Sequence, residues 1–162
     1  MNKEKLTIRA AQKKDASLIL QFIKELAEYE KLSHEVTANE EILSKNLFGE
    51  EAHAKVLIAE LEELAVGFAL YFHNFSTFLA KPGIYLEDLY VKPAYRGQGI
   101  GTQLLKKLAQ IAIEKDCGRL EWSVLNWNED AIRVYEKLGA KAMNEWTTYR
   151  LTGVSLKNLA KK

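Results

Sequence analysis

The chain begins with a pattern that predicts a strand followed by an amphipathic helix. Apolar and polar residues alternate over residues 6–10, which is the period of a half-buried strand. Asp15 is a suitable N-cap for the helix that follows. Four apolar residues then recur at helical spacing, namely Ile19, Phe22, Ile23 and Leu26. They predict one buried helix face, and the helix is expected to end near residues 29–32.

A second, shorter helix is predicted from a capping-box pattern. Residues 37–40 read Thr-Ala-Asn-Glu, in which the Thr side chain can cap the helix start while the Glu reaches back. This helix is expected to extend to about Phe48, because Gly49 is a common stop residue.

The middle of the chain predicts strands that follow one another without intervening helices. Residues 54–59 and 65–72 are apolar runs separated by a tight turn, so they are expected to form an antiparallel hairpin. Residues 74–82 are expected to form a loop. A further strand is expected over residues 84–91, and it carries two adjacent carboxylates. Since side chains alternate along a strand, these carboxylates are expected on opposite faces.

The rest of the sequence predicts alternating helices and strands. Three elements are expected in turn: a helix from near Gly99 to about Lys115, a strand over residues 119–125 and a helix over residues 128–138. The tail is expected to add one or two strands (residues 140–143 and 147–151) and a short helix. This order favours an α/β fold with a mixed, mostly antiparallel central sheet, rather than a doubly wound parallel sheet. With no linker-like stretch in the sequence, a single domain is expected over residues 1–162.

Composition and charge exclude several classes of protein. The chain has 162 residues, of which 48% are hydrophobic, and its 23 Lys and Arg balance its 22 Asp and Glu. This balance predicts neither a nucleic-acid partner nor a membrane partner. A lone cysteine, Cys117, and three scattered histidines offer neither a disulfide nor metal-ligand spacing. With no apolar run near 18 residues and no secretion signal, a cytoplasmic protein without a metal is expected.

The most specific chemical motif is a glycine-rich loop between a predicted strand and a predicted helix. Residues 96–101 read Arg-Gly-Gln-Gly-Ile-Gly. Such a loop gathers backbone N–H groups at a helix start, and an arginine adds charge, so a diphosphate is the expected ligand. The Walker pattern is absent, and the dinucleotide fingerprint fails because residue 102 is Thr instead of Gly. The alternative is a glycine turn that only reverses the chain.

The loop and its surroundings resemble the Gcn5-related N-acetyltransferases. The matching segments are Tyr85-Leu-Glu-Asp-Leu-Tyr-Val91, Tyr95-Arg-Gly-Gln-Gly-Ile-Gly101, Trp127-Asn128, and Val134-Tyr135 followed by Leu138-Gly139-Ala140. Together with Ile23-Lys-Glu-Leu-Ala-Glu-Tyr-Glu-Lys31, they are similar to the diamine acetyltransferase branch, which includes the spermidine/spermine and thialysine enzymes. The resemblance covers nearly the whole chain.

The resemblance implies acetyl-coenzyme A as co-substrate, held where two neighbouring strands splay apart. It assigns the pantetheine arm to the backbone of Leu89, Tyr90 and Val91. The diphosphate is assigned to the loop residues Arg96, Gly97, Gln98, Gly99, Ile100, Gly101 and Thr102. Asn128 and Ala131, at the start of a later helix, complete the expected cofactor set.

The resemblance also implies two catalytic roles. Glu87 corresponds to the proton acceptor for the amine, and Tyr135 to the residue that protonates the leaving thiolate. The chemistry needs such groups, because an alkylamine has a pKa near 10.4 and attacks only when neutral. Backbone N–H groups near Leu89 can stabilise the oxyanion. Spacing alone leaves open a core role for Tyr135 and a solvent-facing role for Glu87.

The expected substrate is a small primary amine. The resemblance assigns substrate contacts to Tyr29, Glu30, Glu87, Glu121, Trp122 and Ser123, and the need for an acidic pocket adds Asp88. Tyr29 can also offer a cation–π contact. Residues 73–82 contain no carboxylate, unlike the acidic loop of the spermidine enzyme, so short diamines and thialysine-like amino acids are favoured over long polycations.

Two alternatives remain open from the sequence. The acceptor could be a protein lysine or a protein N-terminus, or the chain could be a coenzyme A-binding sensor without turnover. The family usually forms homodimers, so a homodimer is expected.

Overall fold

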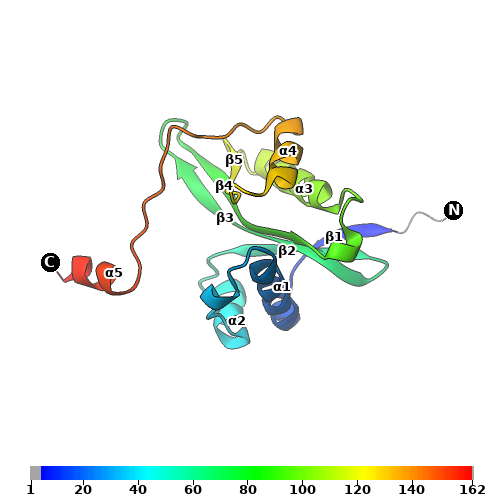
Figure 1. The fold of residues 1–162 in the computed structure, drawn as a ribbon, viewed down its shortest axis with the longest axis horizontal. Helices are drawn as coiled ribbons and strands as arrows, with labels where there is room; N and C mark the ends of the chain where they lie inside the picture. The colour runs from blue at the N-terminus through cyan, green and yellow to red at the C-terminus, as the bar shows by residue number, and fades with distance from the viewer. Residues whose placement is uncertain (1–4, 162) are drawn as a thin grey trace. The chain divides into compact units, whose positions relative to one another are not determined.

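The computed structural model describes residues 5–161, and the chain forms two compact units, residues 1–123 and residues 124–162. The first unit contains the β-sheet and most of the helices (Figure 1). In chain order its elements are β1 (Leu6–Ala10), α1 (Ala16–Tyr29), α2 (Glu40–Phe48), β2 (Lys55–Leu61), β3 (Leu64–Ser76), β4 (Lys81–Val91), α3 (Ile100–Glu114) and β5 (Leu120–Trp122). Short 3₁₀ turns, η1 (Lys13–Asp15), η2 (Ser33–Glu35) and η3 (Pro93–Tyr95), join some of them. The second unit contains α4 (Glu129–Lys137) and α5 (Gly153–Ala160).

The sheet is mixed and mostly antiparallel, which confirms the predicted fold class. Its strands lie in the order β1-β2-β3-β4-β5, and each of the first four is antiparallel to its neighbour. β5 is parallel to β4, so the chain must cross over between them, and α3 makes this crossover. Figure 1 shows α1 and α2 on one face of the sheet and α3 on the other.

The core between α1 and the sheet confirms the predicted helix face. Ile19 and Phe22 are fully buried and Leu26 nearly so, while Ile23 is half-buried at the edge. The ring of Phe22 stacks on Phe68 of β3 with centroids 5.4 Å apart. Burying an aromatic side chain of this kind stabilises the fold by about 1.5–3 kcal/mol. This core fixes α1 against β3 and β4, where the candidate site lies.

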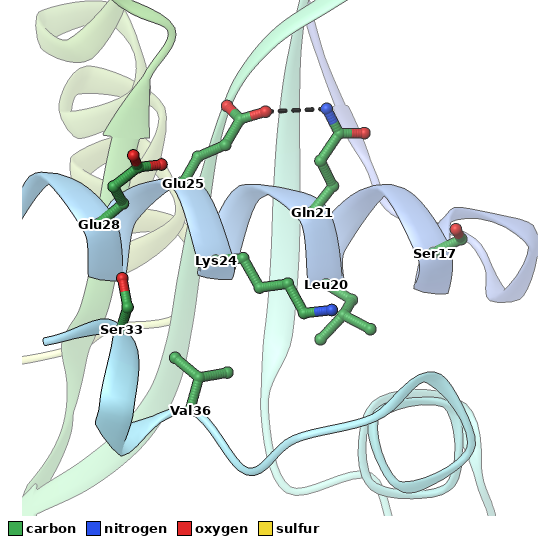
Figure 2. A pocket seen from close by; sticks show the side chains of 8 residues that line it. All are labelled: Ser17, Leu20, Gln21, Lys24, Glu25, Glu28, Ser33 and Val36. Carbon is green, nitrogen blue, oxygen red and sulfur yellow. Dashed lines mark hydrogen bonds between the residues drawn. The ribbon is translucent and has the colours of Figure 1, made fainter.

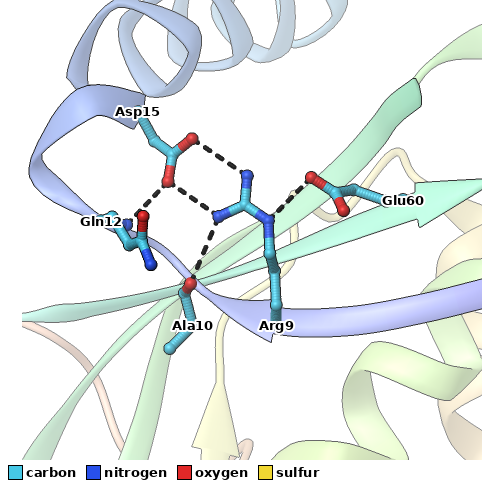
Figure 3. Close-up of polar contacts among 5 residues, drawn as sticks. All are labelled: Arg9, Ala10, Gln12, Asp15 and Glu60. Carbon is cyan, nitrogen blue, oxygen red and sulfur yellow. Dashed lines mark hydrogen bonds and ion pairs between the residues drawn. The ribbon is translucent and has the colours of Figure 1, made fainter. Parts of the chain in front are cut away.

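The two helix-start predictions have different outcomes. Asp15 occupies the N-cap position of α1 as predicted, but its side chain makes no cap hydrogen bond there. It accepts hydrogen bonds from the guanidinium of Arg9 and from the backbone N–H of Gln12 instead (Figure 3). The capping box at residues 37–40 was wrong, because α2 is capped by Asn39, whose Oδ1 accepts from Ile42 N at 2.9 Å. Asn39 is the residue whose extended backbone places a side-chain oxygen within reach of the first turn.

The loop predicted over residues 74–82 is shorter than expected. β3 continues to Ser76 and β4 begins at Lys81, so only residues 77–80 turn. The ladder extends from the Phe72↔Tyr85 pair to the Ser76↔Lys81 pair. Asn, Ser and Pro favour turns locally, but here the hydrogen bonds to the facing strand outweigh that preference.

Strands predicted near the C-terminal end are shorter or absent. β5 covers only Leu120–Trp122 rather than residues 119–125. Residues 140–143 and 147–151 form no strand in the described part of the chain. Alternation of side chains identifies a sequence that could be a strand, but a strand exists only where a neighbour pairs with its backbone groups.

Candidate active site

The sheet opens where β4 and β5 stop pairing. Their parallel ladder joins Ile84, Leu86 and the residue between them to residues 120–122. β4 then continues to Val91 with β3 as its partner on the other side, while β5 has ended. Residues 87–91 therefore present one backbone edge without a strand partner among the described residues. An extended ligand with amide groups can pair with such an edge.

Glu87 forms a β-bulge at the start of this open edge. Leu70 faces Asp88 and Tyr71 faces Leu86, so Glu87 is an extra residue on β4. Bulges bend the strand and re-aim side chains, and they are enriched beside active sites. The bulge also breaks the alternation on which the opposite-face prediction for the two carboxylates rested. Glu87 is exposed to solvent, and Asp88 is half-buried.

Asp88 lies in an environment that disfavours its charged form. Burial raises its pKa to about 6, and the negative charges of Glu87 and Glu30 add to the effect. Glu30 follows the end of α1, and burial also raises its pKa. The fold thus brings together three carboxyl groups from two elements that are far apart in sequence. Perturbed carboxyl groups of this kind are typical of functional sites, and here they can attract a cation or exchange a proton.

A second cluster of polar side chains, made of Tyr85, Glu121 and Ser123, lies on the α1 face of the sheet beside β5. Glu121 pairs with Tyr85 in the register, and the Tyr85 hydroxyl lies 2.6 Å from Ser123 Oγ. Glu121 Oε1 accepts a hydrogen bond from Asn74 Nδ2 at 3.1 Å. Through Tyr85, the structure places Glu121 and Ser123 beside the same residue of β4. Trp122 does not join them, because alternation along β5 directs it to the opposite face.

The glycine loop has the backbone geometry expected of a ligand-binding loop. Gly97 and Gly99 have φ of +76° and +81°, a region that other residues rarely adopt. A Cβ at either position would meet no protein atom within 4 Å, so the space beside both is open. Ile100 begins α3 and its side chain is buried, so only its backbone can reach a ligand. The open space and the helix start suit a phosphate group.

Arg96 makes contacts that the sequence did not reveal. Its Nε donates a hydrogen bond to the carbonyl of Val91 at 2.8 Å, which ties the loop to the end of β4. Its guanidinium also lies over the rings of Tyr29 and Tyr90. The Tyr90 hydroxyl in turn donates to Glu25 at 2.8 Å, and burial together with Glu25 raises the pKa of Tyr90 to about 12. Tyr90 therefore contributes its side chain to the core and has only its backbone available at the open edge.

The second unit presents its predicted residues on α4. Asn128 is the N-cap, and its Oδ1 accepts a hydrogen bond from the backbone N–H of Ala131 at 3.4 Å. This capping role was not predicted, and it leaves the amide nitrogen of Asn128 as the group able to contact a ligand. Tyr135 lies two turns further along α4 and is half-buried.

A groove in the first unit lies apart from these residues. It has a volume of about 570 Å³ and lies between α1 and the segment formed by η2 and the residue after it (Figure 2). Its lining residues are Ser17, Leu20, Gln21, Lys24, Glu25, Glu28, Ser33 and Val36. None of them is a predicted site residue, although Glu25 also accepts the hydrogen bond from Tyr90.

Metal-binding clusters and membrane-spanning helices are both absent from residues 5–161. No group of three or more His, Cys, Asp or Glu side chains is arranged to hold a metal ion there. Within the same residues, no helix combines the length and the apolar character that crossing a membrane requires.

Comparison with known proteins identifies similar chains. The family described as "Acetyltransferase (GNAT) family" matches residues 19–140. The thialysine N-epsilon-acetyltransferase of Bos taurus is 43% identical, and the alignment covers 96% of this chain and 97% of that protein. The L-ornithine N5-acetyltransferase of Arabidopsis thaliana is 43% identical over 66% of this chain and 47% of its own length. An integron cassette protein of V. cholerae has a solved structure with a TM-score of 0.82 and 32% identity, covering 97% of this chain and 98% of that one.

Proposed function

Because the chain belongs to the GNAT acetyltransferase family and is an N-acetyltransferase, we propose that it moves the acetyl group of acetyl-coenzyme A directly to a primary amine of a small molecule. The observation that carries this proposal is the carboxyl cluster of Glu30, Glu87 and Asp88 beside the open edge of β4. A cluster of negative charge favours binding of an ammonium group. The bovine relative is named for thialysine and the Arabidopsis relative for ornithine, so an amino acid with a side-chain amine is the leading candidate, before diamines and polyamines.

The residues of this chain fit a coenzyme A molecule at two places. The open backbone edge of Leu89, Tyr90 and Val91 suits the amides of a pantetheine arm, and the loop from Arg96 to Thr102 suits the diphosphate. Asn128 and Ala131 are assigned to the cofactor by resemblance. Acetyl-coenzyme A would supply an acetyl group activated as a thioester. The residues of the chain itself bind and orient the coenzyme A and the amine, and they move the protons.

Glu87 is proposed as the group that takes the proton of the amine, directly or through one water. An alkylammonium has a pKa near 10.4, so at neutral pH it must lose a proton before it attacks. Glu87 is exposed on the bulge, where a substrate amine can approach it. Asp88 and Glu30 would draw the ammonium toward this point. Backbone N–H groups near Leu89 are proposed to stabilise the developing oxyanion.

Tyr135 is proposed to protonate the leaving thiolate. A phenol has a pKa near 10, so the hydroxyl still carries its proton at neutral pH. The assignment rests on the motif around residues 134–140, which matches the family segment by segment.

The first test is release of free thiol from acetyl-coenzyme A with a panel of amines. The panel contains thialysine, lysine, ornithine, putrescine, spermidine, spermine and a lysine-containing peptide. Turnover with one or more of the small amines is expected. Turnover with the peptide alone would replace the proposal by protein acetylation. No thiol release with any amine of the panel, together with tight binding of coenzyme A, would instead support a coenzyme A-binding sensor without turnover.

Two variants then test the proposed roles. Tyr135→Phe should retain its fold and its affinity for coenzyme A but lose most of kcat. Glu87→Gln should lose the limb of the pH profile of kcat/KM that a general base produces. Unchanged kcat in the first variant, or an identical pH profile in the second, would remove that residue from its role.

A further inference from the structure

We propose that Arg119 is a specificity-determining residue, which binds the α-carboxylate of an amino-acid substrate. This inference rests on the proposed function, because it concerns how the same site selects among amines. The other charged residues assigned to the substrate, Glu30, Glu87, Asp88 and Glu121, are all carboxylates. Arg119 adds a positive charge beside Glu121, and a simple diamine has no anionic group that this charge could bind.

Arg119 lies on the same face of the sheet as the second cluster of polar side chains, made of Tyr85, Glu121 and Ser123. It stands two residues before Glu121, immediately before β5, so both side chains project from one face. Gly83 of β4 makes room for it, since a Cβ at Gly83 would lie only 3.2 Å from Arg119 Cγ and would collide with Asn74. The absence of a side chain at Gly83 lets the arginine stem cross the strand there.

The guanidinium of Arg119 is held in a defined orientation. Its Nε lies 2.8 Å from Glu121 Oε1, and its Nη2 donates to the carbonyl of Phe75 at 3.5 Å. Asn74 donates to the same oxygen of Glu121 and so helps to fix the carboxylate. The contact to Glu121 is an ion pair and the contact to Phe75 is a long hydrogen bond from Nη2, so the N–H groups of Nη1 and the second one of Nη2 remain as donors for a ligand. The side chain of Arg119 is 40% exposed, so a ligand can reach those donors.

The spacing between Glu87 and Glu121 is within reach of a lysine-like side chain. Glu121 faces Tyr85, which precedes Glu87 by two residues, or about 7 Å along β4, and β5 lies about 4.8 Å to the side, so the two positions are about 8 Å apart. A chain of five bonds of about 1.5 Å, as between a lysine ε-nitrogen and its Cα, spans about 6 Å in a zigzag. With a hydrogen bond of about 3 Å between the amine and Glu87, the α-carbon of the same molecule reaches the Arg119–Glu121 pair.

The pair offers one charge of each sign to a zwitterion. A planar guanidinium binds a carboxylate through two parallel hydrogen bonds, and Glu121 lies beside it for the α-ammonium. A diamine or polyamine would bring a second cation against Arg119 instead. Repulsion of the wrong ligand contributes to specificity together with attraction of the right one. Arg119 would thus select amino acids over diamines of equal length.

The test compares thialysine with the diamine that lacks its carboxylate. In Arg119→Gln, kcat/KM for thialysine is expected to fall at least about 10-fold, mainly through KM, because a hydrogen-bonded charge pair is lost. For the diamine, kcat/KM should stay the same or rise. Lys55→Gln, which removes an exposed positive charge at the start of β2, is the matched control and should change neither value. Equal losses for both substrates, or no loss for either, would overturn the inference.

A second comparison leaves the enzyme unaltered, in case Arg119→Gln folds poorly. Wild-type enzyme is assayed with thialysine and with thialysine carboxamide, which keeps both amines and lacks the negative charge. The acid is expected to have at least about 10-fold higher kcat/KM than the amide, and equal values would overturn the inference. A wild-type enzyme that turns over diamines but not amino acids would also overturn it while leaving the proposed function intact. No turnover with any small amine would instead be a failure of the proposed function.

Discussion

The guanidinium of Arg96 lies over the ring of Tyr29, with Cζ 4.5 Å from the ring centroid. Arg96 belongs to the glycine loop proposed for the cofactor, and Tyr29 is the last residue of α1, next to Glu30 of the carboxyl cluster. One side chain thus connects the two halves of the proposed site. Arg96 also donates to Val91 at the end of β4, so its side chain links the loop to both α1 and β4.

The first prediction concerns this contact. Tyr29→Leu should weaken binding of coenzyme A about 2- to 5-fold, because an exposed cation–π contact contributes about 0.5–1 kcal/mol. Tyr29→Phe keeps an aromatic ring and should bind almost as the wild type does. Titration calorimetry with coenzyme A measures both. Equal weakening in the two variants would assign the effect to the phenol oxygen rather than to the ring.

The second prediction concerns the open space beside the glycine loop. Gly99→Ala places a methyl group where no protein atom lies within 4 Å, so the expected result is a loss of coenzyme A affinity without a steric clash inside the protein. The left-handed backbone adds a cost of about 1 kcal/mol in the free energy of unfolding. Affinity is measured by calorimetry and stability by urea unfolding.

Two controls separate these effects. Gly153→Ala has the same kind of backbone strain, with φ of +54°, at the start of α5 outside the loop, and should lower stability without changing affinity. Gly101→Ala lies in the loop sequence but would make only an ordinary contact, 3.9 Å from Val91 Cγ2, so it should cost little stability. Wild-type affinity in Gly99→Ala would show that the ligand does not approach this part of the loop.

The third prediction is a pH dependence of substrate binding. Since the pKa of Asp88 is about 6, its carboxylate is charged above this pH and neutral below it. Lowering the pH through 6 should therefore raise KM for the amine as the attraction to the ammonium weakens. In Asp88→Asn the KM should be high at every pH and this step should vanish. A step near pH 6 that persists in the variant would assign it to another group.

The fourth prediction concerns stability at the same residue. A carboxyl group whose pKa is raised in the folded protein stabilises the fold below its unfolded pKa, near 4, and this contribution is lost as the pH rises to about 6. Above pH 6 the buried charge costs up to about 3 kcal/mol. Asp88→Asn is therefore expected to be more stable than the wild type at pH 8 and not at pH 4. Urea unfolding at both pH values measures this, and an equal difference at the two would contradict it.

The fifth prediction concerns the ion-pair network of Arg9, Asp15 and Glu60 (Figure 3). Hydrogen bonds from Arg9 and from Gln12 N–H outweigh burial and lower the pKa of Asp15. A lowered pKa stabilises the fold above pH 4, and the contribution is lost as the pH falls through the folded pKa. Asp15→Asn should lower the free energy of unfolding at pH 7 by about 1.5–3 kcal/mol.

An exposed ion pair provides the matched control for this network. Asp116 pairs with Lys81 at 2.7 Å, but its side chain is 82% exposed. Asp116→Asn should therefore change the free energy of unfolding by less than about 1 kcal/mol. Losses of similar size in the two variants would mean that the buried position of Asp15 adds nothing.

Local patterns in the sequence determined a large part of the fold. The buried face of α1 follows from helical spacing, since residues three and four apart share one side of a helix whatever the rest of the chain does. The glycine loop and the start of α3 could also be predicted locally, because a few neighbouring residues are enough to indicate a left-handed glycine and a helix start. The family resemblance and the need for an acidic pocket identified Glu30, Glu87, Asp88 and Glu121 as candidates, but they did not show which of these residues come together.

Only the tertiary structure decided how the site is assembled. The bulge at Glu87 exists because β3 and β4 pair in a particular register, and a register joins residues that no local pattern relates. The same holds for Arg96 over Tyr29 and for Arg119 beside Glu121 across the space made by Gly83. Long-range hydrogen bonds also extended the β3–β4 hairpin through a segment of turn-forming residues. The sequence determines which chemical groups the side chains carry. The burial of Asp88 and its nearness to Glu87 and Glu30, which set its pKa, depend on how strands and helices pack together in the folded protein.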